Sequence, residues 1–245
     1  DVPVGTYEVR AAGTYGLSNA RAFLVGDRAE SSEAEPNNAL DQAMELPLET
    51  VLWGRSEPAR DVDYYRFTAQ AGTRLLVQCR AAGIDSRMDA TLELYDPSGT
   101  LPELSRDLDG LDPLIDVKLP VDGEYKLKVH DFVYAGGADY FYRLTLGTGP
   151  RIDYVLPPAG TPGTTATYTL FGRNLPGGAA TEVVTSDGKP LERLDVEIAL
   201  PGDEPALSRM VSDELIAPAA ALLDGVPYRL ASAVGSSNPV TIGLA

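Results

Sequence analysis

The sequence predicts an all-β protein built from small sandwich domains, and three observations predict it. The chain has 24 glycines, 19 prolines and 44% hydrophobic residues in 245 positions, which suits many short segments joined by turns. Short apolar runs alternate with polar residues at period two, the pattern of half-buried strands. Turn residues separate these runs. We therefore expect two or three β-rich domains.

Six alternating runs in the middle of the chain predict antiparallel strands with one wet face each. They are Tyr65/Phe67, Leu75/Val77/Cys79, Leu92/Leu94, Ile115/Val117/Leu119, Tyr125/Leu127/Val129 and Tyr140/Tyr142/Leu144/Leu146. Glycine-containing turns separate them at residues 71–72, 96–99, 122–123 and 136–137. This number and spacing of strands predicts a sandwich or jelly roll. The only helix that we expect is a short one at residues 39–45, capped by an asparagine.

The two ends of the chain resemble each other. GTYEVR at residues 5–10, followed by GLSNA at 16–20, recurs as GVPYRL at 225–230, followed by GSSNP at 235–239. We interpret residues 1–28 as the C-terminal hairpin of a preceding immunoglobulin-like domain. A complete domain of the same kind then occupies residues 149–245, and a separate β-sandwich fills residues 29–148. Strands of the last domain are expected at 152–155, 168–171, 182–185, 196–200 and 228–233.

The charge of the chain excludes some classes of partner. There are 36 acidic and 20 basic residues, a formal net charge of -16, so repulsion disfavours nucleic acid and anionic membranes. The single cysteine, Cys79, cannot form an intrachain disulfide. No apolar run approaches the roughly 20 residues of a membrane helix. The start at Asp1 in mid-pattern and the absence of a signal peptide lead us to expect a piece of a longer protein.

Clustered acids and amides give the strongest chemical signal. EAEPNN at residues 33–38 is followed by the acidic pair in DVDYYRF at residues 61–67. Carboxylate and amide oxygens are hard ligands of the kind that calcium prefers. The alternative is a solvated acidic surface with an asparagine cap. Residues 107–112 form a second acid-rich stretch, but it lacks the spacing of an EF-hand loop.

Catalysis finds little support in the residue types present. His130 is the only histidine, and by alternation it shares a strand face with Lys126 and Lys128, away from the core. Cys79 alternates with core residues, and no cysteine and histidine set suits zinc. A carboxylate pair could hydrolyse a glycoside, but no pattern marks a cleft. We expect a protein that is not an enzyme, with an enzyme as the least favoured of three functions.

Residues from about 30 to 147 resemble the bacterial pre-peptidase C-terminal (PPC) domain, a β-sandwich found beside the catalytic domains of secreted bacterial peptidases. The resemblance rests on EAEPNN at 33–38, DVDYYRF at 61–67, AGT at 71–73, DATLELYD at 89–96 and GEYKLKV at 123–129. GRNL at 172–175 is similar to a step of transcription-factor-type (TIG/IPT) immunoglobulin folds. This combination resembles large secreted or surface proteins of planctomycete-type bacteria. The implied fold is a jelly-roll-like PPC β-sandwich plus an immunoglobulin-like β-sandwich.

The resemblance implies a calcium site, because related collagen-binding domains hold calcium with the equivalent segments. The positions that match here are Glu33, Glu35, Asn37, Asn38, Asp61 and Asp63. Clustered carboxylates support this assignment independently, since like charges about 4 Å apart repel by roughly 4 kcal/mol at an effective dielectric near 20. Calcium would reverse that repulsion and fix an interdomain linker.

Two functions follow from this reading. The first is a structural or scaffold segment of a secreted or cell-surface protein, with neighbouring domains of the same or a like chain as partners. The second is an accessory module that binds an extracellular polysaccharide or protein for a secreted hydrolase. Tyr64, Tyr134 and Phe141 support the second function, because they fall on faces opposite the expected core and could stack on a ligand. Packing against a neighbouring domain is the alternative for these aromatics.

Overall fold

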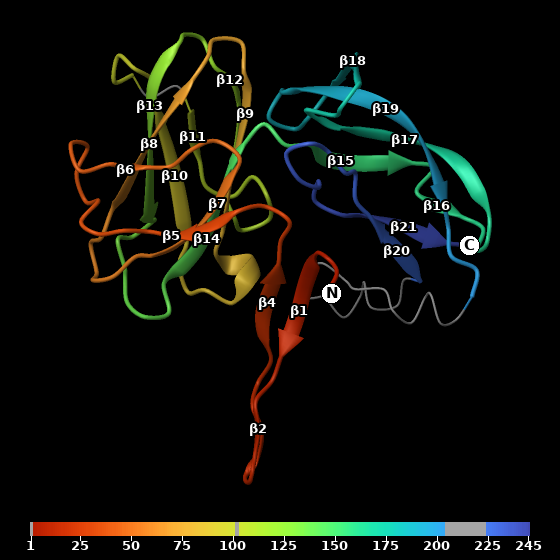
Figure 1. Ribbon diagram of the computed structural model, residues 1–245, viewed down its shortest axis with the longest axis horizontal. Helices are drawn as coiled ribbons and strands as arrows, with labels where there is room; N and C mark the ends of the chain where they lie inside the picture. Colours follow the sequence, from red (N-terminus) through yellow and green to blue (C-terminus); the bar gives the residue numbers. More distant parts are fainter. Residues whose placement is uncertain (1, 101–102, 204–223) are drawn as a thin grey trace. The chain divides into compact units, whose positions relative to one another are not determined.

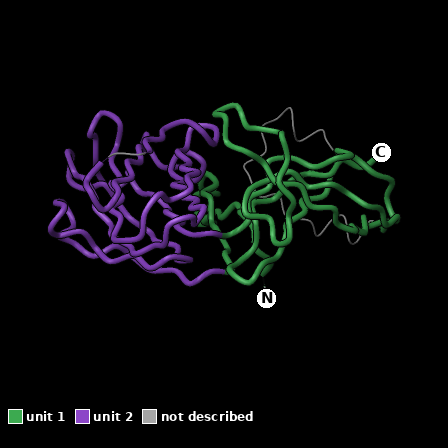
Figure 2. Tube along the Cα trace, turned by 90° about the horizontal axis from the view of Figure 1, so that it is seen from above, with its two compact units in different colours: residues 1–27, 149–245 green, residues 28–148 purple. Residues whose placement is uncertain are grey.

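The structure is a computed structural model that describes residues 2–100, 103–203 and 224–245. It confirms the all-β class (Figure 1). The chain forms two compact units, which Figure 2 shows in separate colours. Unit 1 combines Asp1–Asp27 with Gly149–Ala245, and unit 2 is Arg28–Thr148.

Unit 2 is a sandwich of two five-stranded sheets. One sheet has the order β11-β10-β13-β8-β6 and the other the order β12-β9-β14-β7-β5. Their bounds are β5 Glu30–Ser32, β6 Met44–Glu45, β7 Thr50–Arg55, β8 Asp63–Ala69, β9 Arg74–Arg80, β10 Ala90–Tyr95, β11 Glu103–Ser105, β12 Leu114–Lys118, β13 Gly123–Asp131 and β14 Phe141–Gly147. All six predicted strands of this region are present, as β8, β9, β10, β12, β13 and β14.

Alternation explains the core of unit 2. Along β8 and β13 every second side chain is buried, and Tyr65, Phe67, Tyr125 and Leu127 all lie between the sheets. Cys79 is fully buried in the same core. Because the tyrosines carry hydroxyl groups, their burial requires polar partners inside the sandwich.

The chain between β5 and β6 crosses from one sheet to the other. β5 pairs in parallel with β7, and β6 pairs in parallel with β8. The Glu33 N–H continues the first ladder by donating to the Trp53 carbonyl over 2.9 Å. The EAEPNN segment therefore lies inside unit 2. This corrects the expectation of an interdomain linker at residues 33–38, because backbone pairing has already joined the chain to the sandwich by Glu30.

Unit 1 contains two sheets that enclose a second core. Their orders are β15-β17-β19-β18 and β16-β21-β20. The bounds are β15 Arg151–Leu156, β16 Ala159–Gly160, β17 Thr165–Arg173, β18 Ala179–Val184, β19 Pro190–Ala199, β20 Gly225–Tyr228 and β21 Val240–Leu244. The predicted strand at 228–233 is therefore wrong in extent, because β20 ends at Tyr228. Residues 204–223 of the predicted immunoglobulin-like domain lie outside the described residues.

The structure explains the residue types of GRNL at positions 172–175. A Cβ atom on Gly172 would lie 2.1 Å from the Arg151 carbonyl oxygen, so only glycine allows β17 to approach β15 there. Asn174 has a positive φ of 52°, which asparagine tolerates better than most residues. Leu175 then turns into the core of unit 1.

Unit 1 also includes the N-terminal hairpin. β1 Gly5–Val9 pairs antiparallel with β4 Arg21–Val25, and the short β2 Ala12–Gly13 and β3 Gly16–Leu17 continue towards its tip. Figure 1 shows this hairpin in red.

The predicted helix at residues 39–45 is wrong. Turns occupy residues 39–42, and Met44 already belongs to β6. The segment must rejoin β8 within a few residues, and strand pairing at Met44 outcompetes a short helix that has no packing face. Within the described residues the only helical turn is the 3-10 helix η1 Ala82–Ile84.

Candidate metal centre

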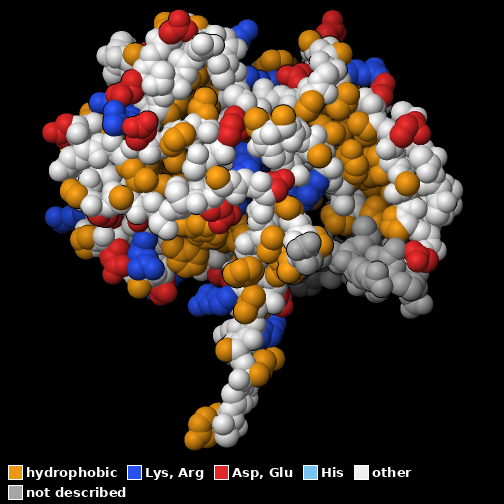
Figure 3. Space-filling view, in the orientation of Figure 1, with side chains coloured by type: hydrophobic (Ala, Val, Ile, Leu, Met, Phe, Trp, Pro, Cys, Tyr) orange, Lys and Arg blue, Asp and Glu red, His pale blue; other side chains and the backbone are white. Residues whose placement is uncertain are grey.

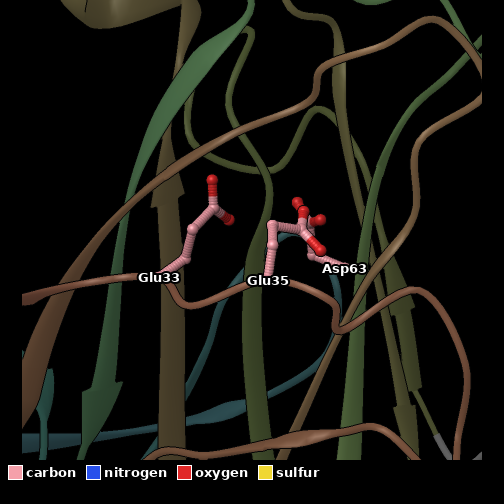
Figure 4. A group of neighbouring side chains, drawn as sticks. All are labelled: Glu33, Glu35 and Asp63. Carbon is pink, nitrogen blue, oxygen red and sulfur yellow. The ribbon is translucent and has the colours of Figure 1, made fainter.

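Three carboxylates from two parts of the sequence meet in unit 2. Glu33 and Glu35 come from the segment that crosses between the sheets, and Asp63 begins β8. One carboxylate oxygen from each lies within 4.8 Å of the others. Figure 4 draws the three side chains. Asp63 is fully buried, Glu33 is half-buried and Glu35 is exposed. The cluster therefore reaches from the interior to solvent.

Buried tyrosine hydroxyls hold the inner side of the cluster. The Tyr142 hydroxyl donates to Asp63 Oδ2 over 2.5 Å and also lies 3.2 Å from Glu33 Oε2. The Tyr65 hydroxyl lies 3.2 Å from the same Glu33 oxygen and 2.6 Å from the Tyr142 hydroxyl. The Arg55 N–H donates to Glu33 Oε1 over 2.5 Å. These contacts fix the Glu33 and Asp63 side chains in place.

The backbone of Asn37 contacts both Glu35 and β8. Its backbone N–H donates to Glu35 Oε2 over 2.9 Å, and its carbonyl accepts from the Tyr64 N–H over 2.9 Å. The second bond attaches the crossing segment to β8 beside Asp63. Asn37 is fully buried, yet its Oδ1 and Nδ2 atoms have no hydrogen-bond partner within the described part of the chain. Asp63 Oδ1 is buried without a partner there in the same way.

The cluster is electrostatically unfavourable as it stands. Burial, together with the charges of Glu33, Asp61 and Glu35, raises the pKa of Asp63 to about 8 despite the lowering effect of the Tyr142 hydroxyl. Burial also raises the pKa of Glu33, despite the donors that surround it. A raised carboxyl pKa means that the charged form is disfavoured in the folded protein, here mainly by burial and secondly by the neighbouring carboxylates.

The remaining two predicted ligands are placed differently. Asp61 is buried next to the cluster, but its two oxygens accept the N–H groups of Glu57 at 2.7 Å and Val62 at 3.0 Å. Burial, followed by the Glu35 charge, raises the pKa of Asp61 despite those two bonds. Asn38 is exposed. The structure thus groups Glu33, Glu35 and Asp63 with Asn37, while Asp61 braces the loop at Glu57.

This donor set suits a hard divalent cation. Glu33, Glu35 and Asp63 offer carboxylate oxygens, and Asn37 and Asp63 each hold a buried oxygen with no partner among the described residues. Oxygen-only sets of this kind fit calcium, whereas zinc prefers nitrogen and sulfur. A cation would account for both unpaired oxygens but not for Asn37 Nδ2. Sequence reasoning missed the two tyrosines, although their place in strands that face the acidic segments was a usable signal.

A second buried aspartate in unit 2 is fully satisfied. Asp112 Oδ1 accepts the N–H groups of Ala81 at 2.9 Å and Ala82 at 2.8 Å, and Oδ2 accepts that of Gly83 at 3.1 Å. A Cβ atom on Gly83 would lie 2.9 Å from Asp112 Oδ2, so glycine makes room for the carboxylate. Asp112 therefore anchors η1 and belongs to the acid-rich stretch 107–112 that we considered as a weaker site.

His130 is placed in a network of side chains. It is buried, at 5% exposure, with Nε2 3.0 Å from Glu93 Oε1 and Nδ1 2.8 Å from the Asp131 carbonyl. Lys128 Nζ lies 3.0 Å from the same Glu93 oxygen. The ring of His130 stacks on Tyr134 at 4.7 Å. Lys128 and His130 thus share a face, as predicted, but the histidine is covered by Tyr134 and is not a surface residue.

Comparisons with known proteins place unit 2. Residues 61–131 match the model of a family described as the bacterial pre-peptidase C-terminal domain. This confirms the PPC resemblance for the middle of the chain. The match includes Asp61 and Asp63 but does not reach residues 33–38. The immunoglobulin-like and TIG/IPT resemblances of the flanking regions, and the planctomycete setting, stay predictions.

Similar proteins were found both by sequence and by structure. A protein of Deinococcus radiodurans, described as a probable subtilase-type serine protease, is 33% identical over 99 residues, covering 39% of this chain and 14% of that protein. The solved pre-peptidase C-terminal domain of a Bacillus anthracis collagenase is 16% identical, covering 49% of this chain and 98% of that one, with a TM-score of 0.35. Aeromonas hydrophila PliG, a periplasmic inhibitor of g-type lysozyme, is also 16% identical, covering 48% and 99%, with a TM-score of 0.32.

Among the residues that the structure describes, no helix is long and apolar enough to span a membrane.

Proposed function

We propose that this chain is a non-catalytic structural segment of a secreted or cell-surface bacterial protein, and that unit 2 binds calcium through Glu33, Glu35, Asn37 and Asp63. The observation that carries the proposal is a pair of buried oxygens with no partner among the described residues, Asn37 Oδ1 and Asp63 Oδ1, beside three converging carboxylates. The ion would offset carboxylate repulsion and fasten residues 33–38 onto β8.

The strand topology shows what such an ion would stabilise. Residues 33–43 connect β5 in one sheet to β6 in the other, and the strands that they join are only three and two residues long. Short edge strands contribute little stability by themselves. A cation held by Glu33, Glu35 and Asp63 would tie this crossing to the long strand β8, and so hold the two sheets at one edge.

A thermal melt tests the proposal. At about 100 times the dissociation constant, bound calcium adds about 2.7 kcal/mol to the free energy of unfolding, a rise of several degrees in Tm. Extracellular calcium modules bind with Kd values on the order of 10⁻⁴ to 10⁻³ M, so about 10 mM calcium against a chelator is the right comparison. The control is Glu124→Gln, which removes an exposed carboxylate outside the cluster and should leave the calcium response unchanged. An identical Tm with calcium and with chelator would refute the metal site.

The second candidate is an accessory module that binds substrate for a secreted hydrolase. The observation that favours it is the similarity to part of a probable subtilase-type serine protease. Tyr134, 41% exposed and stacked on His130, offers a rigid aromatic surface on unit 2. Pull-down of the chain by insoluble polysaccharide or fibrous protein, lost on Tyr134→Ala and retained on Phe132→Ala, would favour this function over the scaffold.

A further inference from the structure

Unit 1 contains the same hairpin twice. In the N-terminal copy, Ser18 N–H donates to the Ala11 carbonyl over 2.8 Å, and Ser18 Oγ accepts the Ala11 N–H over 2.8 Å. In the C-terminal copy, Ser237 N–H donates to the Leu230 carbonyl over 2.9 Å, and Ser237 Oγ accepts the Leu230 N–H over 2.9 Å. Each serine hydroxyl also donates to the carbonyl of the following asparagine. The sequence repeat is therefore a repeat of structure.

The two copies differ at the asparagine. Asn238 binds the backbone of the first strand of its own domain: Oδ1 accepts the Ile152 N–H over 2.8 Å, and Nδ2 donates to the Ile152 carbonyl over 2.8 Å. This pair of bonds joins the hairpin to the sheet β15-β17-β19-β18. Asn19 is the equivalent residue, and its exposed side chain makes no hydrogen bond within the part of the chain that the structure describes.

The copies differ again in what covers their apolar faces. The inner face of β20 and β21 contains Val226 and Ile242, which are 4% and 0% exposed within the core of unit 1, with Tyr228, Val240 and Leu244 packed beside them. By strand pairing, Tyr7 and Phe23 take the places of Val226 and Ile242. Neither belongs to a core cluster of the described residues, and Phe23 is 57% exposed.

The hairpin therefore presents a face built for burial. Tyr7, Val9, Phe23 and Val25 lie on one side of the two strands, together with Arg21. Val9 is 50% exposed, whereas Tyr7 and Val25 are half-buried. Figure 3 shows hydrophobic side chains on the surface of the hairpin. A two-stranded hairpin with an exposed apolar face is marginal on its own and needs a sheet to pack against.

We infer that the β1–β4 hairpin docks onto a four-stranded immunoglobulin-like sheet that precedes Asp1 in the same polypeptide, and that Asn19 binds the backbone of the first strand of that sheet. Order along the chain supports this occupant, because in the C-terminal copy the receiving strands β15 to β19 precede the hairpin β20–β21. A complete domain cannot serve as receiver, since Asn238 already occupies its Ile152 backbone groups.

Cysteine labelling tests the inference with the chain of residues 1–245 and with the same polypeptide extended N-terminally by one domain of its natural sequence. Native Cys79 is fully buried and gives a slow background with Ellman's reagent. A Phe23→Cys variant should react rapidly in the shorter chain and at least about tenfold more slowly in the longer one. Tyr15→Cys, at the exposed hairpin tip, should react rapidly in both, and Val226→Cys slowly in both.

The asparagines supply a matched pair of variants. Asn19→Ala should raise the labelling rate at position 23 in the extended polypeptide and lower its Tm, while leaving the Tm of the shorter chain unchanged. Asn238→Ala should raise the labelling rate at position 226 in both lengths. Rapid labelling at position 23 in both lengths would overturn the inference. Slow labelling in the shorter chain would also overturn it: if the rate depended on protein concentration, a second copy would be the occupant.

Discussion

Asp63 and Asp112 are both buried aspartates in the same sandwich, and their surroundings are opposite. Asp112 receives three backbone N–H groups from residues 81–83. Asp63 receives one tyrosine hydroxyl, keeps one buried oxygen with no partner among the described residues, and lies beside two glutamates. Both oxygens of Asp112 have donors, as is usual for a buried structural carboxylate, whereas Asp63 has an oxygen available to the ion that we propose. Burial alone would not have separated the two.

The largest expected loss of stability comes from replacing Asp112, the aspartate with a full set of donors. Asp112→Ala leaves three N–H groups near η1 without their acceptor, and should lower the free energy of unfolding by about 3 kcal/mol or more, since each unsatisfied buried group costs roughly 1–3 kcal/mol. Chemical denaturation measures it. Asp122→Ala is the control, because Asp122 accepts a single exposed N–H, from Ala71, and should cost about 1 kcal/mol or less. Equal losses for the two variants would remove the distinction.

The second prediction is a gain of stability instead of a loss. Asp63→Asn removes a buried charge that repels its neighbours, so at pH 8 it should raise the Tm of the calcium-free protein. It should also abolish the rise in Tm on adding calcium, which we expect to be worth about 2.7 kcal/mol at about 100 times the dissociation constant. Melts of wild type and variant, each with calcium and with chelator, measure both effects. A variant less stable than wild type without calcium would show that Asp63 is structural, like Asp112.

The third prediction concerns pH. The pKa of Asp63 is raised from 3.8 to about 8 in the folded protein, so the folded state binds this proton more tightly than the unfolded state. Its contribution to stability is present below about pH 4 and is lost as pH rises to about 8. Calcium must displace the same proton, so its affinity should rise by up to about tenfold per pH unit between pH 5 and 8. Calcium titrations by calorimetry at pH 5.5, 6.5 and 7.5 would reveal a flat profile if Asp63 were not a ligand.

The smallest expected change in stability comes from the exposed member of the cluster. Glu35→Gln should alter the free energy of unfolding of the calcium-free protein by no more than about 0.5 kcal/mol, because the side chain lies at the surface. It should nevertheless abolish the calcium-dependent shift. Glu57→Gln, an exposed glutamate paired with Arg55, is the matched control and should keep the shift. A full calcium response in Glu35→Gln would exclude Glu35 as a ligand.

The fold was predictable from sequence where strands were long and alternating. β8, β13 and β14 each show period two over seven or more residues, and turn residues bound them. The short strands β5, β6 and β16 were not predicted, because two or three residues contain no measurable period and their pairing is parallel with distant strands. The helix predicted at 39–45 failed because Met44 pairs with β8, a contact between distant residues that local sequence does not show.

The candidate site was predictable in kind and only partly in detail. The PPC resemblance brought Glu33, Glu35 and Asp63 into one hypothesis, and the structure places them together. Local sequence could not reveal that backbone N–H groups would occupy Asp61, or that Asn37 would be buried while Asn38 faces solvent. The hydroxyls of Tyr65 and Tyr142 enter the site from two different sheets, a relation that depends on tertiary packing.

The parallel pairing of β5 has a consequence for a protein under tension. Glu30 and Thr145 both lie opposite Val51 of β7, so the chain enters and leaves unit 2 at the same end of one sheet. A force that separates residues 28 and 148 therefore peels β5 away pair by pair, a low-force mode, instead of shearing all its bonds at once. After the three residues of β5, the load reaches Glu33 and Glu35. An ion held there would resist further opening of unit 2.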